Sequence, residues 1–243
     1  MNIPIITYTN SRCSDALVIY LDLLRKYYGI PSHTILTDRI IYDNKSEPLP
    51  NIKYITYNDK DPFYDIWIRC LSNFQSKYFL YMQEDFFLYK PVNADLLNYY
   101  LQVMEENDHI SCIRLLKSGI NSNIPAEGIS SLFYVDYNTD YPFSMQPTIW
   151  RTKDFLKIQE TKIQVIPWDE WKINGDVLLK LDLTSLYHYN NESKRGMSHY
   201  GSDVFPYIAT ALVKGKWNTK EYPELKVILK EYNVDISKRG EYE

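Results

Sequence analysis

The sequence contains few glycines, and their positions exclude two common classes of nucleotide-binding enzyme. The chain has 8 glycines among 243 residues, and the first, Gly29, lies beyond the first predicted helix. No G-x-G-x-x-G turn and no phosphate-binding Gly-Lys loop can therefore follow the first predicted strand. This excludes dinucleotide-dependent oxidoreductases and P-loop enzymes. It also disfavours sugar nucleotidylyltransferases, which use a glycine-rich loop at the same place.

Cysteine, excess positive charge and long apolar runs are also scarce. The three cysteines, Cys13, Cys70 and Cys112, are widely spaced and form no C-x-x-C pair, so we expect reduced core residues in an intracellular protein. A net charge of -4 at pH 7 argues against non-specific nucleic-acid binding, which needs a basic surface. The apolar runs are too short to span a membrane and no signal peptide is recognised, so we expect a cytoplasmic location.

Hydrophobic periodicity predicts alternating strands and helices in the first 90 residues. The predicted strands are 3–9, 33–37, 52–57 and the fully buried 78–82, and the predicted helices are 16–28 and 62–74. The resulting order β-α-β-β-α-β predicts an α/β fold with a mostly parallel central sheet flanked by helices.

The rest of the chain continues this pattern around one irregular stretch. The predicted elements are helices at 94–106, 153–159, 204–212 and 222–232, and strands at 109–115, 162–166 and 184–189, with a short apolar segment at 145–150. Residues 117–144 are rich in Ser, Asn, Gly and Pro, and we expect a long excursion that carries binding residues. No repeat or linker is visible, so a single domain over 1–243 is the simplest interpretation.

Two adjacent acids, Glu84 and Asp85, follow the buried strand at 78–82. Unpaired carboxylates are costly to bury, and ligands bind at the carboxyl ends of strands in open α/β sheets. A diphosphate bound through Mg²⁺ or Mn²⁺ is a suitable partner, because these ions take hard oxygen ligands. The alternative is an acidic loop between two core strands.

A second acid pair, Asp169 and Glu170, lies between Trp168 and Trp171. Sugar transfer that inverts the anomeric centre needs a general base on the acceptor hydroxyl, normally a carboxylate. Indole rings stack on sugar rings, so an acid flanked by tryptophans suits an acceptor site. The alternative is a helix start whose acidic first turn is favoured by the helix dipole.

Several single residues are weaker candidates. His199 follows the last predicted strand and is a candidate metal ligand or diphosphate contact, whereas the strand-like setting of His188 favours a core histidine. Arg69 and Arg114 are candidate phosphate contacts, with surface or ion-pair roles as the alternative. Asp38 is a candidate contact to the nucleobase or the ribose of the donor, although Asp is also common at strand ends.

Six segments, in order along the chain, carry a resemblance to a known family. They are 7–11 (TYTNS), 36–38 (LTD), 78–86 (YFLYMQEDF), 146–151 (QPTIWR), 167–170 (PWDE) and 231–235 (EYNVD) with Arg239-Gly240. In this order they resemble the GT-A family of nucleotide-sugar-dependent glycosyltransferases, in particular the small glycosyltransferases of bacteria and large DNA viruses. The resemblance covers most of the chain, but each motif is short.

The resemblance implies a GT-A fold, with a donor half at about 1–90 and an acceptor half at about 91–243. It implies a UDP- or dTDP-sugar donor and a glycan or glycoconjugate acceptor, in the host cytoplasm if the source is a virus. The implied donor contacts are Thr7, Tyr8, Thr9, Asn10, Asp38, Gln83, Glu84 and Asp85. Arg69, which no matched segment contains, is added to these donor contacts as a candidate phosphate contact. The implied acceptor contacts are Gln146, Trp150 and Trp168, with Asp169 or Glu170 as the base and Asp85 as a metal ligand. His199, which no matched segment contains, is added as a second candidate metal ligand because of its position after the last predicted strand.

One departure from the family pattern concerns the metal. Gln83-Glu84-Asp85 stands where the family has Asp-x-Asp, so Asp85 is the expected ligand and Glu84 a ribose or outer contact. Some family members with Gln-Asp-Phe at this place work without metal. The alternatives are therefore a metal-independent or retaining glycosyltransferase, or a non-catalytic module that binds nucleotide or sugar. The sequence does not indicate an oligomeric state.

Overall fold

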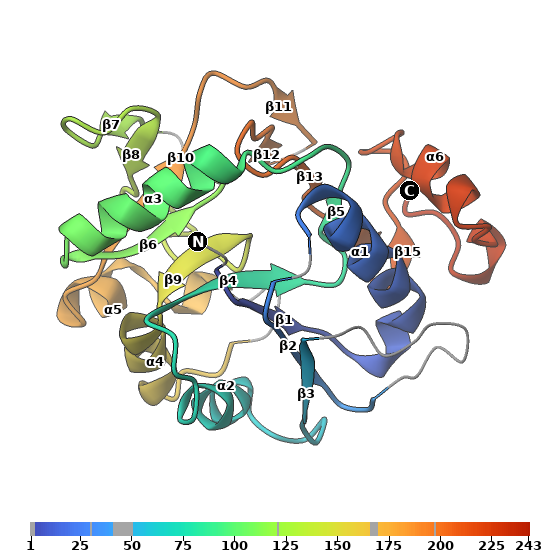
Figure 1. Ribbon diagram of the computed structural model, residues 1–243, viewed down its shortest axis with the longest axis horizontal. Coiled ribbons are helices and arrows are strands. Elements are labelled where there is room, and N and C mark those ends of the chain that lie inside the picture. The colour runs from blue at the N-terminus through green and yellow to red at the C-terminus, as the bar shows by residue number, and fades with distance from the viewer. Residues whose placement is uncertain (1–2, 30, 41–50, 121, 166–169, 197) are drawn as a thin grey trace.

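The computed structural model describes residues 3–29, 31–40, 51–120, 122–165, 170–196 and 198–243 (Figure 1). The helices are η1 (Ser11–Cys13), α1 (Ser14–Tyr27), α2 (Phe63–Leu71), α3 (Ala94–Glu106), α4 (Thr152–Glu160), η2 (Glu170–Lys172), α5 (Gly175–Lys180), α6 (Leu225–Glu231) and η3 (Ile236–Lys238). The strands of the main sheet are β1 (Ile5–Tyr8), β2 (His33–Thr37), β3 (Ile52–Thr56), β4 (Tyr78–Gln83), β6 (Ile110–Arg114), β7 (Ile124–Pro125), β8 (Leu132–Tyr134), β9 (Thr148–Arg151) and β10 (Thr184–His188). Short paired strands are β5 (Phe87–Leu88), β11 (Lys194–Arg195), β12 (His199–Tyr200), β13 (Tyr207–Ile208), β14 (Leu212–Val213) and β15 (Lys216–Trp217).

The main sheet has nine strands in the order β3-β2-β1-β4-β9-β6-β10-β8-β7. Strands β1 to β4 are parallel, and β10 is parallel to β6, whereas β9 runs antiparallel between β4 and β6. Helices α2 and α4 lie side by side, and α3 lies along β6 (Figure 1). The predicted α/β fold with a mostly parallel sheet flanked by helices is confirmed.

The sheet register brings the strand ends that carry the candidate residues to one edge. Tyr8, the last residue of β1, is paired with Gln83 on β4 and with Leu36 on β2. Because the strands are parallel, the segments that follow them leave the sheet on the same side. Glu84 and Asp85 therefore emerge next to the segment that follows Tyr8.

Two predicted elements differ from the structure. No strand forms over 162–165, because Lys162 has a φ of 56° in the turn that ends α4; the last residue of the predicted strand, Ile166, lies outside the described residues. The predicted helix at 204–212 is instead a non-helical segment with bends, and it contains β13 and the start of β14. Its side chains from Val204 to Leu212 are all buried, and β13 pairs antiparallel with β5, so tertiary strand pairing decides this segment.

The core lies on both faces of β4. Five of its six side chains, Tyr78 to Met82, are buried, which confirms the sequence interpretation of this strand. On one face Phe79 and Tyr81 pack with Trp67 of α2 and Phe155 of α4. Among the helices of the described ranges, none has the length and apolar character needed to cross a membrane.

Candidate functional site

Two cavities lie at the edge of the sheet where β1 and β4 end. The first has a volume of about 370 Å³ and the second about 440 Å³. The first is bounded by the segments after β1, β3 and β4 and by the turn between β14 and β15. The second is bounded by residues 118–120, residues 140–146 and the β11–β12 hairpin. Gln83 and Asp85 line both cavities, so these two side chains lie where the cavities meet.

Aromatic rings form one wall of the first cavity. The ring of Tyr8 stacks on Tyr57 with a centroid distance of 5.4 Å and an interplanar angle of 9°. Phe63 meets Tyr8 edge to face at 5.1 Å. The Tyr57 hydroxyl donates to the Thr9 carbonyl at 2.7 Å, which holds this ring in place. A flat aromatic wall of this kind is suited to stacking on a planar ligand such as a nucleobase.

The first cavity also contains polar groups that a ligand could satisfy. The Thr9 hydroxyl is buried without a hydrogen-bond partner among the described residues, and Thr9 lines the cavity. Such an orphaned hydroxyl is unfavourable unless it gains a partner. Two exposed cations, Arg12 and Lys214, reach the same cavity from η1 and from the β14–β15 turn. Neither was predicted, and Lys214 carries no local sequence signal because it lies more than 200 residues from β1.

Asp85 lies where the two cavities meet, and Glu84 lines the first cavity within the electrostatic influence of Arg239. The Asp85 side chain is buried and accepts from the Leu212 amide at 3.3 Å, while Glu84 is partly buried. Burial raises the pKa of Asp85, and the adjacent Glu84 charge raises it further; burial also raises the pKa of Glu84. Within the part of the chain that the structure describes, no ion pair involves either carboxylate. A divalent cation would relieve this unpaired charge with oxygen ligands, so the two residues fit Mg²⁺ or Mn²⁺.

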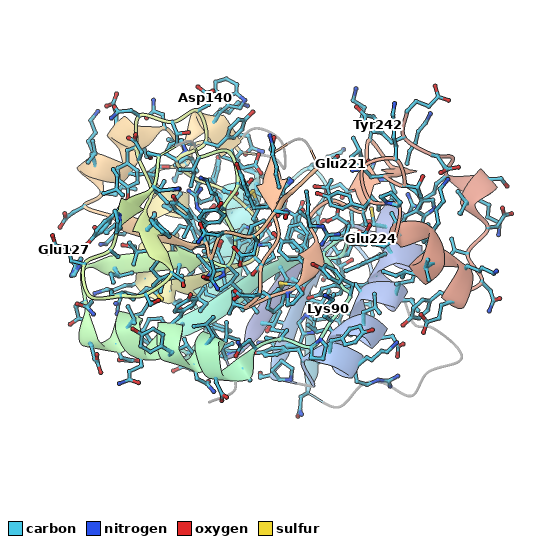
Figure 2. All side chains as sticks on the ribbon, turned by 90° about the horizontal axis from the view of Figure 1, so that it is seen from above. Lys90, Glu127, Asp140, Glu221, Glu224 and Tyr242 are labelled. Atoms are coloured by element: carbon cyan, nitrogen blue, oxygen red, sulfur yellow. The ribbon has the colours of Figure 1, made fainter. Side chains whose placement is uncertain are left out.

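The second cavity combines carboxylates with hydrogen-bonding groups. Asp140 and Glu170 line it, together with Gln146, whose side-chain oxygen accepts from the Tyr207 hydroxyl at 2.7 Å. Asp140 is exposed and lies at the edge of the molecule (Figure 2). His199 of β12 lines the same cavity, and burial lowers the pKa of its imidazole to about 4, so it is neutral at pH 7. The arrangement offers both proton acceptors and donors to a hydroxyl-bearing ligand.

Arg114 supports the loop that forms one wall of the second cavity. It is almost fully buried at the end of β6, and its guanidinium donates to the carbonyls of Tyr141 and Pro142. These carbonyls belong to the loop that contributes Asp140 and Gln146 to the cavity wall. The structure therefore gives Arg114 a supporting position, and it lines neither cavity.

The structure brings together nine of the predicted site residues at these cavities. They are Tyr8, Thr9, Asn10, Gln83, Glu84, Asp85, Gln146, Glu170 and His199. Asn10 is held in place because its amide donates to Asp59 at 2.9 Å and its oxygen caps η1. Asp169 and Trp168 lie outside the described residues.

Four other predicted residues lie away from both cavities. Thr7 is buried in the core, where its hydroxyl bonds to Tyr20 and His33 at 2.8 and 2.7 Å. Trp150 is 2% exposed and packs on Phe155 at 5.1 Å, since β9 is an interior strand.

The remaining two, Asp38 and Arg69, already have protein partners. Asp38 accepts from the Ser11 amide and hydroxyl at 2.5 and 2.7 Å, and Arg69 pairs with Asp61 at 2.6 Å. Local polarity identified both residues, but neither lines a cavity. The candidate site therefore does not include Thr7, Trp150, Asp38 or Arg69.

Comparisons with known proteins give only remote likenesses. No family model matches the chain, and no curated protein matches it significantly. A cytidylyltransferase from Leptospira borgpetersenii serovar Hardjo-bovis is 12% identical over 100% of both chains, with a TM-score of 0.46. CMP:2-keto-3-deoxy-manno-octonic acid synthetase complexed with CTP is 10% identical over 94% of this chain and 99% of that chain, with a TM-score of 0.48. S. aureus TarS is 15% identical over 98% of this chain and 41% of that chain, also with a TM-score of 0.48. At these identities and TM-scores the likenesses do not indicate a function.

Proposed function

We propose that the protein transfers a sugar from a nucleoside-diphosphate-sugar donor to a hydroxyl acceptor. The observation that carries this proposal is the meeting of two cavities at Gln83 and Asp85. A transferase of this kind must hold two substrates with their reacting atoms adjacent. The donor would occupy the first cavity and the acceptor the second, with the donor sugar at the shared wall.

The groups of the first cavity support its assignment to the donor. The base would stack on the Tyr8–Tyr57 pair, and the Thr9 hydroxyl would gain its missing hydrogen bond. Arg12 and Lys214 would lie near the diphosphate and balance part of its charge. A divalent ion held by Asp85 and Glu84 would supply electrostatic stabilisation of the diphosphate leaving group.

The second cavity supports the acceptor half of the reaction. The acceptor hydroxyl would attack the anomeric carbon and give its proton to a carboxylate, as the bond from that carbon to the diphosphate oxygen breaks. Glu170 is the described carboxylate from the predicted acid pair, and it lines this cavity. Gln146, held by Tyr207, would orient the acceptor through its amide.

Nucleotide binding can be tested without knowing the acceptor. Melting temperatures would be measured with a panel of nucleoside diphosphates, with and without Mn²⁺, for wild type, Tyr8→Ala and Gln146→Ala. We expect one diphosphate, UDP or dTDP, to raise the melting temperature of wild type and of Gln146→Ala but not of Tyr8→Ala. The absence of any nucleotide effect on wild type would exclude the donor assignment.

Turnover separates the transferase from its alternatives. The release of nucleoside diphosphate from the matching nucleotide-sugar, to water or to an added glycan, would be followed in wild type and Glu170→Gln. Glycosyl transfer predicts this product, with a rate about 10²–10⁴-fold lower in Glu170→Gln. Release of pyrophosphate from a nucleoside triphosphate would indicate nucleotidyl transfer instead. Binding without any turnover would indicate a non-catalytic module, and activity in chelator a metal-independent enzyme.

A further inference from the structure

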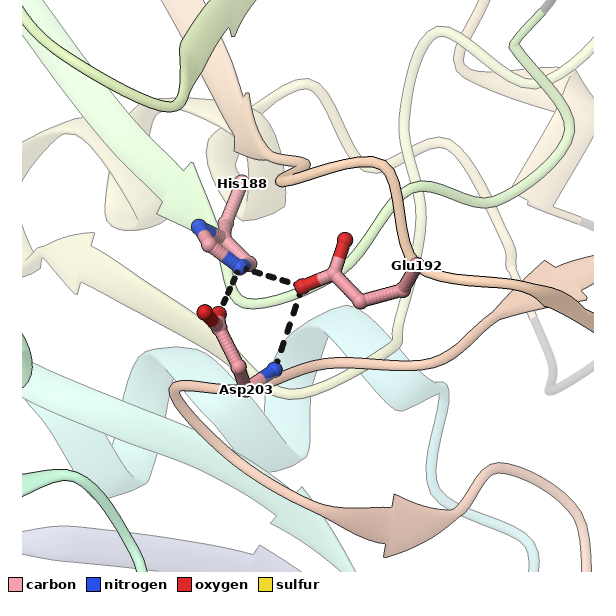
Figure 3. A group of neighbouring side chains, drawn as sticks. All are labelled: His188, Glu192 and Asp203. Carbon is pink, nitrogen blue, oxygen red and sulfur yellow. Dashed lines mark hydrogen bonds and ion pairs between the residues drawn. The ribbon is translucent and has the colours of Figure 1, made fainter.

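Three side chains converge outside both cavities, at the base of the β11–β12 hairpin (Figure 3). They are His188 at the end of β10, Glu192 in the following loop and Asp203 after β12. The Nε2 atom of His188 lies 3.0 Å from Glu192 Oε1 and 2.6 Å from Asp203 Oδ1. One imidazole nitrogen thus faces two carboxylates that come from different segments.

The imidazole of His188 is held in one orientation. Its side chain is fully buried, and its Nδ1 atom forms a hydrogen bond of 2.7 Å with the hydroxyl of Tyr100 on α3. This contact fixes the ring so that Nε2 points at the two carboxylates. A hydrogen bond to the far ring nitrogen is the usual support of a metal-binding histidine.

The two carboxylates are arranged to present one oxygen each to the same point. The other oxygen of Glu192 accepts from the Asn190 amide at 2.6 Å, and the other oxygen of Asp203 accepts from the Asn190 side chain at 2.9 Å. Among the described residues, the cation partner of both is the imidazole and no Lys or Arg forms an ion pair with them. A single imidazole carries at most one positive charge, so two converging carboxylates leave negative charge uncompensated.

We propose that His188 Nε2, Glu192 Oε1 and Asp203 Oδ1 bind a divalent transition-metal ion, with Zn²⁺ as the best match. One nitrogen and two oxygens, with water in the fourth position, suit Zn²⁺. The three ligand atoms lie within 4.8 Å of one another. Ligands about 2.0–2.1 Å from a tetrahedral ion lie about 3.3 Å apart, so Asp203 Oδ1 must move outward by about 0.7 Å and Glu192 Oε1 by about 0.3 Å. Asp203 is 46% exposed and has room for this movement.

The ion would stabilise the position of the β11–β12 hairpin and would not take part in sugar transfer. Residues 188 and 203 bracket the β11–β12 hairpin, which contributes Lys194, His199 and Tyr200 to the second cavity. An ion that joins both ends of this segment would hold the hairpin against α3. The ion would therefore order one wall of the second cavity from outside.

The test measures metal binding in the absence of nucleotide, so its failure would leave the proposed transfer reaction unaffected. Chelator-treated, dialysed protein is titrated with ZnCl₂ by calorimetry, and bound zinc is counted by elemental analysis. All variants carry Asp85→Asn, which removes binding at the acid pair between the cavities. We expect one zinc per chain in this background and in the added control Glu127→Gln, an exposed carboxylate on the β7–β8 turn (Figure 2).

The variants at the cluster decide the outcome. Asp203→Asn is isosteric and partly exposed, so it keeps the fold, and we expect zinc affinity to fall at least 10-fold. Tyr100→Phe keeps all three ligands but removes the hydrogen bond to Nδ1, and we expect a loss of about 10-fold or more. Co²⁺ bound in place of zinc should give visible absorption that disappears in Asp203→Asn. Lack of stoichiometric zinc binding, or equal affinity in Asp203→Asn, would overturn the proposal and leave an imidazole bridged by two carboxylates.

Discussion

At the scale of single residues, Asp85 combines burial with an adjacent like charge. The residue is 8% exposed, and its carboxylate receives one amide hydrogen bond at 3.3 Å. Both burial and the Glu84 charge raise its pKa, so the ionised form destabilises the metal-free protein. Ligand binding and folding therefore make opposite demands on this residue.

We predict that Asp85→Asn stabilises the metal-free protein at pH 7.5. The amide keeps the shape of the carboxylate and removes the unpaired charge, so we expect a gain of about 1–3 kcal/mol. For a chain of this size each kcal/mol corresponds to about 2–4 °C in melting temperature. Scanning calorimetry in chelator measures the change. The exposed Asp140→Asn serves as the control and should be neutral, while a lower melting temperature in Asp85→Asn would contradict the argument.

His33 gives a second prediction at this scale, through pH. It is buried at the start of β2, with its Nε2 atom 2.7 Å from the Thr7 hydroxyl. Burial lowers the pKa of its imidazole to about 3, whereas in the unfolded chain it is about 6.5. The folded state therefore binds fewer protons than the unfolded state, so stability present above pH 6.5 is lost as the pH falls.

We expect His33 to remove about 2 kcal/mol of unfolding free energy between pH 6.5 and pH 5. In His33→Gln this contribution is absent, so its stability should fall less steeply over the same interval. Urea unfolding at several pH values measures both curves. His109→Gln, at an exposed histidine, should follow wild type. Parallel curves for wild type and His33→Gln would show that His33 is not the titrating group.

At the scale of secondary-structure elements, Arg151 connects β9 with α3 and β6. Its guanidinium is fully buried at the junction of β9 and α4 and donates to the carbonyls of Met104, Asn107 and Ile110 at 2.8, 3.2 and 3.1 Å. The first two carbonyls lie at the C-terminus of α3, where backbone acceptors lack helical partners. One side chain therefore ties the end of α3 and the start of β6 to β9.

We predict that Arg151→Met destabilises the protein by about 3–5 kcal/mol. The substitution removes the charged donor from these three carbonyls, although Met104 keeps the Tyr78 hydroxyl and Asn107 keeps the Ile110 amide as donors. It also removes the buried partner of Asp154, which lies 3.5 Å from Arg151 Nε. Urea unfolding measures the loss. Lys153→Met, at an exposed position on the first turn of α4, is the matched control and should change stability by less than about 0.5 kcal/mol. An equal effect in both variants would refute the role of the buried guanidinium.

At the scale of the whole molecule, the sheet does not divide at residue 90. In the main sheet β4, from the first half of the chain, pairs with β9 from the second half, and β5 and β13 form a separate two-stranded sheet across the same boundary. Asp85 also receives hydrogen bonds from the amides of Ala211 and Leu212. The proposed donor and acceptor halves therefore share one sheet.

We predict a single cooperative unfolding transition, with equal calorimetric and van't Hoff enthalpies. For the same reason the fragment 1–90 should not fold alone, because it leaves the β9-facing edge of β4 and its apolar faces exposed. Calorimetry of the full chain and circular dichroism of the fragment test this. Two resolved transitions, or a folded fragment with a melting transition of its own, would show that the halves are separate domains.

Local sequence predicted the elements whose burial and capping are set by neighbouring residues. The predicted helix at 94–106 and the predicted strand at 33–37 match α3 and β2 at both ends. α3 begins after Asn93, whose side chain caps the helix by accepting from the Leu96 amide at 3.1 Å. Periodicity of apolar residues and a capping side chain depend on residues that are close in the sequence, so both can be recognised without the tertiary structure.

The position of the acid pair at the carboxyl end of a buried strand could also be predicted from the local sequence, and so could the α/β class. Only the tertiary structure decided which side chains face a cavity. Trp150 and Thr7 match the motif positions but lie in the core, whereas Tyr57, Arg12 and Lys214, in no recognised motif, line the first cavity. The segment 204–212 is not helical because β13 pairs with β5, more than 100 residues away. A cavity is formed by surfaces that the chain brings together from distant segments, and local hydrophobic pattern does not encode which distant surfaces meet.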